Sequence, residues 1–224
     1  MSHDRWRDEL RATADDPNAI ATLLARELPS DGLQHAGNAI LAIPQSELLD
    51  ALTATVVDAL NQRGWDGDVA LVHELQNRTG RAATDLTPLP VALEQLAEAL
   101  EQSDGAESFL DLVTGTVWPA ELFDVDQGPD DFDADDSDRW LVVLGMGSSG
   151  GHSDMLQFIA TVTDRELADR LEMAVEGRGA FRRFRAELER HSAELTRWHR
   201  LRDDSQLGRA RQWLAERGDG ASRA

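Results

Sequence analysis

The spacing of apolar residues over positions 1–104 restricts this part of the chain to helices. Apolar side chains recur there at intervals of three and four, which places them on one face of an α-helix. Pro17 suits a first helical turn, and Gly64 suits the end of a helix. The expected helices cover residues 17–28, 44–63, 67–77 and 90–102. The sequence therefore predicts an all-helical domain over residues 1–104.

The period of the apolar residues changes after Ser103. Short apolar runs flank Val113-Thr114-Gly115, where glycine permits the positive φ of a tight turn, so we expect a β-hairpin. The sequence RWLVVL at 139–144 is the strongest strand candidate. Further helices are expected over residues 153–162, 164–176, 179–202 and 204–217. The predicted fold class is α+β, in which an all-helical N-terminal half precedes a mixed domain over residues 107–219. We expect that domain to be a small antiparallel three-stranded meander packed with about four helices.

Charge is distributed unevenly along the chain. The net charge is −20, and all 22 basic residues are arginine. Residues 1–104 hold 7 arginines against 18 acids, and residues 105–138 hold 11 acids and no arginine. Residues 139–224 hold 15 arginines against 13 acids. A field of this sign disfavours non-specific binding to nucleic acid or to anionic membranes. Nucleic-acid binding is therefore expected only in residues 139–224.

The composition also limits the compartment and the chemistry of the chain. No apolar run approaches the roughly 20 residues that a membrane-spanning helix needs, so we expect no membrane association. The first residues, MSHDRWRDEL, carry charges where a secretory signal would be apolar. Cysteine is absent, which excludes disulfides, thiolate zinc sites and iron–sulfur clusters. A cytoplasmic location is the expectation.

Residues 121–138 form an acidic loop, with nine acids among eighteen residues. We expect this segment to be too charged to pack and to be mobile. Its acids partly follow the spacing of a calcium-binding loop. No starting point gives glycine at position 6 and glutamate at position 12, which that loop requires. The sequence therefore predicts no metal site.

The glycine-rich loop at 145–151 matches two short enzyme motifs. Gly145 to Gly150 fits the G-x-G-x-x-G turn of dinucleotide-binding domains, but no second parallel strand with a ribose-binding acid follows it. Gly147 to Gly151 fits the G-x-S-x-G nucleophile elbow, yet helices rather than strands are expected around it. We therefore predict no catalytic residues and no cofactor.

The most informative segment is GRGAFRRFR, residues 177–185. From here the apolar residues continue at helical spacing and are Phe181, Phe184, Leu188, His191, Leu195 and Trp198. With this seam packed inward, Arg178, Arg182 and Arg185 form an outward stripe beside a helix N-terminus, a combination suited to binding anions. In a purely structural interpretation, Arg183 begins a series of intrahelical ion pairs, and the glycines only separate two helices. The candidate binding residues are Gly177, Gly179, Arg178, Arg182, Arg183 and Arg185.

Four segments of the second half belong together as a pattern. They are FLDLVTGTV at 109–117, DMLQFI at 154–159, the arginine-rich segment at 177–185, and Trp198 with Trp213-Leu214. This combination resembles uncharacterised protein family 0158 over about residues 107–217. The resemblance implies a strand–Thr-Gly–strand hairpin followed by helices, and it implies no established activity. The chain departs from the family pattern at Arg185, where lysine is usual, and in the glycine loop.

These observations favour a non-catalytic cytoplasmic interaction or regulatory protein that contacts a protein partner through its arginine-rich helix. One alternative is binding of a nucleotide or RNA phosphate by the same arginines. Another is that the acidic loop acts as an inhibitor or immunity-type surface that mimics nucleic acid. A related hypothesis is that the acidic loop covers the arginine-rich helix and gates access to it.

Overall fold

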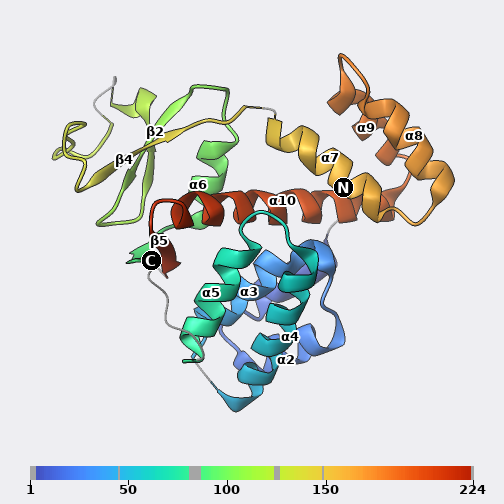
Figure 1. Cartoon of the computed structure of the whole chain (residues 1–224), viewed down its shortest axis with the longest axis horizontal. Helices are drawn as coiled ribbons and strands as arrows, with labels where there is room; N and C mark the ends of the chain where they lie inside the picture. Colours follow the sequence, from blue (N-terminus) through green and yellow to red (C-terminus); the bar gives the residue numbers. More distant parts are fainter. Residues whose placement is uncertain (1–3, 45, 81–86, 124–126, 148, 223–224) are drawn as a thin grey trace.

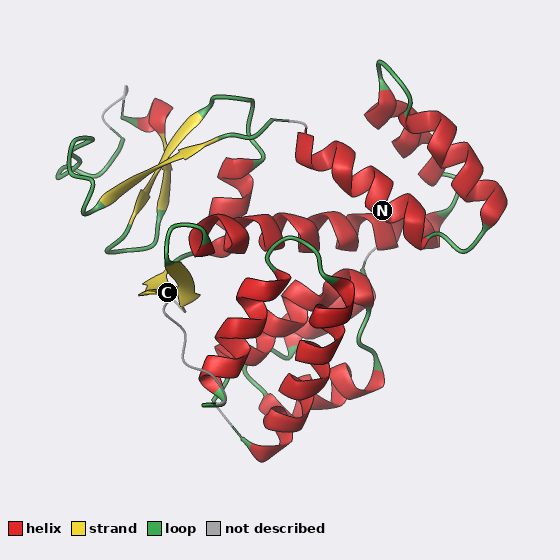
Figure 2. Ribbon diagram, viewed as in Figure 1, coloured by secondary structure: helices red, strands yellow, loops and turns green. Residues whose placement is uncertain are grey.

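The computed structural model describes residues 4–44, 46–80, 87–123, 127–147 and 149–222 (Figure 1). The N-terminal half is helical, and a small three-stranded antiparallel sheet follows it, which confirms the predicted α+β class. Figure 2 shows the three-stranded sheet gathered at one end of the molecule, with helices making up most of the remainder. No helix in the described ranges is long and apolar enough to cross a lipid bilayer.

The N-terminal helices enclose an apolar core of their own. They are α1 (Arg5–Ala12), α2 (Pro17–Arg26), the 3-10 turn η1 (Ser30–Gly32), α3 (Leu33–Ala42), α4 (Glu47–Arg63) and α5 (Asp68–Arg78). Pro17 occupies the first turn of α2 below the capping side chain of Asp16, and Gly64 ends α4 in the left-handed conformation. The most buried members of this core include Ile20, Leu33, Ile40, Leu60 and Leu71.

The three-stranded sheet consists of β2 (Glu107–Asp111), β3 (Val117–Pro119) and β4 (Trp140–Leu144). The predicted hairpin is present, because Phe109 pairs antiparallel with Trp118. The predicted meander is wrong, since the strand order is β3-β2-β4 and β4 pairs with β2. β3 is short and ends at Pro119, which has no N–H to offer a further strand. The next strand, β4, therefore pairs with the free edge of β2 instead of with β3.

Two elements that precede this sheet pack with it. Helix α6 (Leu93–Leu100) buries Leu96 and Leu100 in one cluster with Leu110 of β2 and Val143 of β4. Strand β1 (Thr87–Pro90) pairs in parallel with β5 (Asp219–Ser222), which the sequence did not predict. By its contacts, α6 thus lies with the sheet, although the expected helical domain extended to residue 104.

The remaining helices are α7 (Ser149–Thr161), α8 (Arg165–Val175), α9 (Ala180–Leu188) and α10 (Ser192–Ala215). The predicted single helix over 179–202 is wrong, because the chain breaks between α9 and α10 at residues 189–191. The predicted break near residue 203 is absent as well, since α10 continues through it. Both α9 and α10 direct apolar residues into one cluster, so the spacing looks continuous although the chain turns between them.

Helix α10 joins all parts of the molecule (Figure 1). Its Leu201 belongs to the cluster of α7, α8 and α9, and its Leu214 belongs to the cluster of α6 and the sheet. Its contact with the N-terminal helices is polar. Asp204 accepts hydrogen bonds from the backbone N–H of Gln34 at 2.8 Å and pairs with Arg63 at 2.7 Å. The N-terminal half is therefore held to α10 by buried ion pairs.

These pairs continue along the helix. Arg200 binds Asp31 at 2.8 Å, and Arg211 binds Glu74 at 2.9 Å. Because each of these carboxylates is largely buried, removal of one partner would leave an unpaired charge in the interface.

Candidate functional site

The arginine-rich segment forms the turn between α8 and α9. Gly177 has φ 69° and Gly179 has φ 81°, a left-handed conformation in which a side chain would be strained. The glycines therefore allow the chain to reverse between the two helices. Figure 1 shows this helical pair at the opposite end of the molecule from the sheet, so the turn lies far from the most acidic segment of the chain.

Arg183 holds this turn together rather than facing a partner. Its Nε donates to the carbonyl of Ala174 at 3.2 Å, and its Nη1 donates to the carbonyl of Arg178 at 2.5 Å. Its Nη2 donates to the carbonyl of Glu176. The carbonyls of Ala174 and Glu176 lie at the C-terminal end of α8, where a cation also complements the helix dipole, and that of Arg178 lies in the turn. The intrahelical pair of Arg183 with Glu187 is not formed in the structure, because Glu187 pairs with Arg170 and Arg190.

The other three arginines of the segment lie on the surface, as the pattern predicts. Arg185 is exposed and pairs with Glu189 at 3.1 Å. Arg178 and Arg182 are exposed, and within the described part of the chain neither guanidinium group makes a hydrogen bond or an ion pair. In contrast, arginines elsewhere in the second half, such as Arg170 and Arg209, pair with carboxylates. The turn therefore presents two guanidinium groups that the protein itself does not use.

The apolar seam beneath these arginines is only partly as predicted. Phe184 and Trp198 are buried with their ring centroids 4.8 Å apart, and Leu188 is buried beside them. Phe181 is 46% exposed, so its predicted inward position is wrong. Phe181 lies in the first turn of α9, and its ring borders Gly151 at the start of α7. An exposed aromatic ring thus accompanies the two unpaired arginines.

The glycine-rich loop is not arranged to receive a phosphate. The backbone N–H of Gly145 donates to the carbonyl of Ala106 at 2.7 Å, and that of Gly147 donates to the carbonyl of Gln102 at 2.9 Å. These donors are therefore occupied within the protein. The strand before the loop, β4, belongs to an antiparallel sheet, which is not the parallel context of a dinucleotide-binding turn. Ser148 of both motifs lies outside the described residues.

The acidic loop is anchored to the sheet by aromatic residues, although the sequence predicted that it would not pack. Phe132 stacks on Phe123 with ring centroids 3.8 Å apart, and it meets Trp140 edge-to-face at 5.0 Å. Arg139 pairs with Asp131 at 2.5 Å. Residues 124–126 of the loop lie outside the described residues. Figure 1 shows the loop beside the sheet, at the opposite end of the molecule from α9, so the gating hypothesis is wrong.

One feature of the structure had no counterpart in the sequence analysis. A cavity of about 590 Å³ lies between α1, α3, α6 and α10. Its walls come from four segments that are distant in the sequence, so no local spacing marks it. His35 is the local signal nearest to it, because it is a titratable side chain among the apolar residues of α3. Among the described residues, no group of three or more His, Asp or Glu side chains is arranged to hold a metal ion.

The residues of the sequence pattern noted above have identifiable structural roles. Asp111 accepts from the backbone N–H of Val113 at 2.9 Å and so shapes the hairpin turn. Asp154 is buried and binds Arg209 at 2.7 Å. Burial raises the pKa of the Asp154 carboxyl, and Arg209 opposes this shift. Phe158 packs edge-to-face on Trp198 with centroids 5.6 Å apart. The pattern therefore describes a core and its turns.

Comparisons with known proteins place the second half of the chain in one family. Residues 86–218 match the model of a family described as Uncharacterised protein family (UPF0158). The searches of curated proteins and of solved structures found no match. The matched region contains β1, α6, the sheet and all four C-terminal helices, including α10, to which the N-terminal half is docked. Since this match spans more than half of the 224 residues, the chain belongs to the uncharacterised protein family UPF0158.

Proposed function

We propose that the protein is a non-catalytic interaction or regulatory protein that contacts an acidic protein partner through the α8–α9 turn. The contact surface comprises Arg178, Phe181, Arg182 and Arg185 and is called the arginine surface below. The observation that carries the proposal is that Arg178 and Arg182 are exposed and unpaired in a chain with 42 acids and 22 arginines. In such a chain, arginines are scarce, and most of the described ones serve ion pairs within the fold.

The mixture of charge and apolar surface favours a protein partner. Interfaces between proteins are enriched in arginine and aromatic residues, and their strongest contacts combine an apolar anchor with a charged group. Phe181, at 46% exposure, supplies the anchor beside Arg182. A polyanion such as RNA would meet the repulsion of the whole chain, whose net charge is −20. An acidic patch on a partner of small net charge meets far less of that repulsion.

In this proposal, the role of Arg183, Gly177 and Gly179 is structural. They shape the turn and hold the arginine surface in position, and they do not contact the partner. A cytoplasmic location forms part of the proposal, supported by the absence of cysteine.

A comparison of partners recovered by charge-reversal variants tests the proposal. The full chain is captured from lysates of its own cells as wild type and as Arg178→Glu with Arg182→Glu, and the recovered proteins are quantified. Arg5→Glu with Arg165→Glu is the control, because both residues are exposed and the net charge changes equally. We expect partners to be retained by the control and lost from the Arg178/Arg182 variant. Equal recovery with both variants would remove the arginine surface from consideration.

The same variants separate the two alternatives from this proposal. Binding of RNA or nucleotide phosphate predicts filter retention that falls steeply with salt and disappears in the Arg178/Arg182 variant. Action through the acidic loop predicts loss of partners when Asp133, Asp135 and Asp136 are changed to asparagine, with no effect of the arginine changes. All three of these aspartates are exposed.

A further inference from the structure

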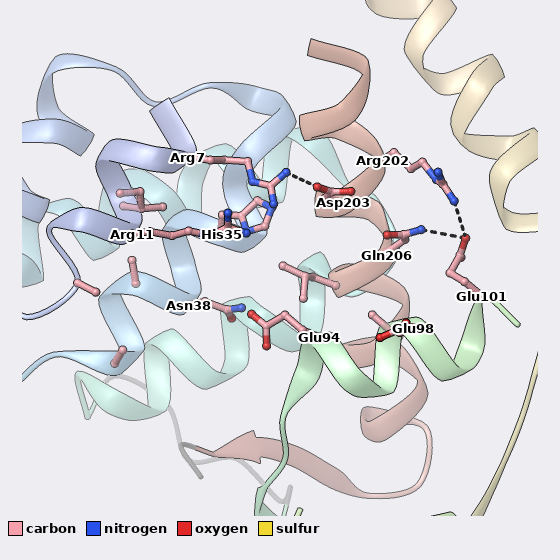
Figure 3. Close-up of a pocket in the computed structure, with 16 residues that line it drawn as sticks. Arg7, Arg11, His35, Asn38, Glu94, Glu98, Glu101, Arg202, Asp203 and Gln206 are labelled. Carbon is pink, nitrogen blue, oxygen red and sulfur yellow. Dashed lines mark hydrogen bonds and ion pairs between the residues drawn. The ribbon is translucent and has the colours of Figure 1, made fainter. Parts of the chain in front are cut away.

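The cavity between the two halves of the molecule has the size and lining of a small-molecule site. It encloses about 590 Å³, within the range of roughly 300–1,000 Å³ that is typical for such sites. Helices α1 and α3 of the N-terminal half form one side, and α6 and α10 form the other (Figure 3). Its apolar lining consists of Leu10, Ala14, Ala39, Ala42, Ala97 and Leu207. The small alanine side chains leave the space open.

Some of the charged groups around the cavity are already paired. Arg7 binds Asp203, and the dashed lines in Figure 3 show Arg202 and Gln206 directed at Glu101. These contacts join neighbouring helices and form the rim. The pairing of Arg202 with Glu101 leaves no free charge for a ligand on that part of the wall.

Three other charged groups at the cavity have no such partner. Arg11 of α1 and Glu94 and Glu98 of α6 are exposed, and within the described ranges none of their side chains makes a hydrogen bond or an ion pair. Arg11 lies on the side of α1 and α3 beside His35, whereas Glu98 projects from α6 (Figure 3). Arg11 and Glu98 thus lie on different sides of the cavity, whereas Glu94 extends from α6 toward Asn38 of α3 (Figure 3).

Two polar atoms without a hydrogen-bond partner lie on the side of the cavity formed by α1 and α3. Nε of Arg7 and Nε2 of His35 are buried, and neither has a hydrogen-bond partner. Burial, reinforced by the nearby Arg7 and Arg11, lowers the pKa of His35 to about 4, so the ring is neutral at pH 7. Leaving such a buried polar group unpaired costs about 1–3 kcal/mol. An oxygen that accepts a hydrogen bond from Arg7 would remove part of this cost.

We infer that this cavity binds a small organic monocarboxylate with an apolar body. The carboxylate lies beside Arg11, Arg7 and His35, where it accepts charge-assisted hydrogen bonds. The apolar body covers the alanine-lined wall of Ala39 and Ala42. Glu98 on α6 repels a second negative charge on the ligand, which disfavours dicarboxylates. Because the ligand contacts helices of both halves, its binding strengthens the docking of the N-terminal half on α10.

Calorimetry and thermal unfolding of the full chain test this inference. The probes are hexanoate, 4-methylpentanoate and phenylacetate, each compared with its neutral amide and with the dicarboxylate adipate. We expect the monocarboxylates to bind and to raise the unfolding temperature, and the amides and adipate to bind at least about tenfold more weakly. In NMR spectra, the ring signals of His35 should shift as the acid is added.

Two variants locate the binding. Arg11→Gln should weaken it about tenfold, whereas Arg5→Gln, an exposed arginine on the same helix, should leave it unchanged. Ala39→Leu fills the cavity and should abolish binding while circular dichroism shows an intact fold. The inference is overturned if none of the three acids binds, if the amides bind equally well, or if Ala39→Leu binds as wild type does.

Discussion

Gly67 and Gly208 touch backbone to backbone where the N-terminal half meets α10. A Cβ atom built on Gly67 would lie 2.1 Å from the carbonyl oxygen of Gly208, and one on Gly208 would lie 2.2 Å from the carbonyl oxygen of Asp66. Both distances are far below any ordinary contact. Only glycine at each position allows the loop before α5 to approach α10 so closely.

Substitution of Gly208 by alanine should therefore destabilise the docking of the two halves. The added methyl group forces the loop and α10 apart, and overpacking of this kind costs about 1–3 kcal/mol. Urea unfolding followed by circular dichroism gives the free energy of unfolding. Gly67→Ala should cost more, because Gly67 also has φ 76°. Gly80→Ala is the matched control for strain alone, since Gly80 has φ 67° with open space around it. Equal losses for Gly67 and Gly80 would contradict the close contact.

Truncation of two adjacent arginines at the start of α9 should change the free energy of unfolding by different amounts. Arg183→Ala removes three hydrogen bonds to carbonyls at the end of α8 and in the following turn, and it should lower the free energy of unfolding by about 1–2 kcal/mol. Arg182→Ala removes an unpaired surface group and should change it by less than about 0.5 kcal/mol. Thermal and urea unfolding of both variants measure the difference. A stability loss in Arg182→Ala equal to that in Arg183→Ala would show that Arg182 also supports the turn.

The stability of the protein should fall between pH 6.5 and pH 4 because of His35. Burial lowers its pKa in the folded state to about 4, while the unfolded chain binds a proton near the ordinary value of 6.5. Arg7 and Arg11 face the ring and lower the pKa, and Asp203 and Glu94 face it and raise the pKa. The unfolded state therefore gains a proton first as the pH falls, which costs up to about 3 kcal/mol of stability. His35→Gln should remove this loss, as measured by urea unfolding at several pH values.

Asp204 acts in the opposite direction over the same interval. Burial raises its pKa to about 6 in the folded state, although Arg63 and two backbone N–H groups favour the charged form. The folded state then holds an extra proton between about pH 4 and pH 6, so this group's contribution to stability declines as the pH rises through that interval. Relative to wild type, Asp204→Asn should therefore gain stability with rising pH from 4 to 6. An unchanged difference between the two proteins at pH 4 and pH 7 would disprove the raised pKa.

Removal of one aromatic ring should release the acidic loop from the sheet. Phe132 contacts Phe109, Phe123 and Trp140, so Phe132→Ala breaks three ring contacts at once. We expect rapid proteolytic cleavage within residues 121–138 in this variant and slow cleavage in wild type, as followed by mass spectrometry. Val142→Ala, an exposed position on β4, serves as the control. Cleavage of wild type at the same rate would indicate that the rings do not hold the loop.

Local signals in the sequence predicted the elements better than their arrangement. Pro17 and Gly64 mark helix ends that the structure contains, and Thr114-Gly115 marks the hairpin turn. The strand order was not predicted, because the choice of β2 or β3 as a partner for β4 depends on Pro119 at the end of β3. The pairing of β1 with β5 joins residues 87–90 to residues 219–222, and no local pattern links segments so far apart.

The candidate site was predicted in part for the same reason. The exposure of Arg178 and Arg182 follows from their spacing against buried Phe184. The role of Arg183 was missed, because its partners are backbone carbonyls at the end of α8 and in the turn, which have no sequence signature. Phe181 was assigned to the core because its spacing from Phe184 and Leu188 matches that of buried residues, although it lies in the exposed first turn of α9. The cavity is formed by the packing of four helices that are distant in the sequence. The spacing of residues along the chain therefore does not predict it.

The position of α10 along the chain determines the order in which the protein assembles during synthesis. The core of α1 to α5 contains no residue of α10, so it is able to form while the ribosome is still translating later codons. The clusters around the sheet and around α7 to α9 both require residues 198–214. Their apolar surfaces therefore stay incomplete until α10 emerges, and exposed apolar surface of this kind favours aggregation.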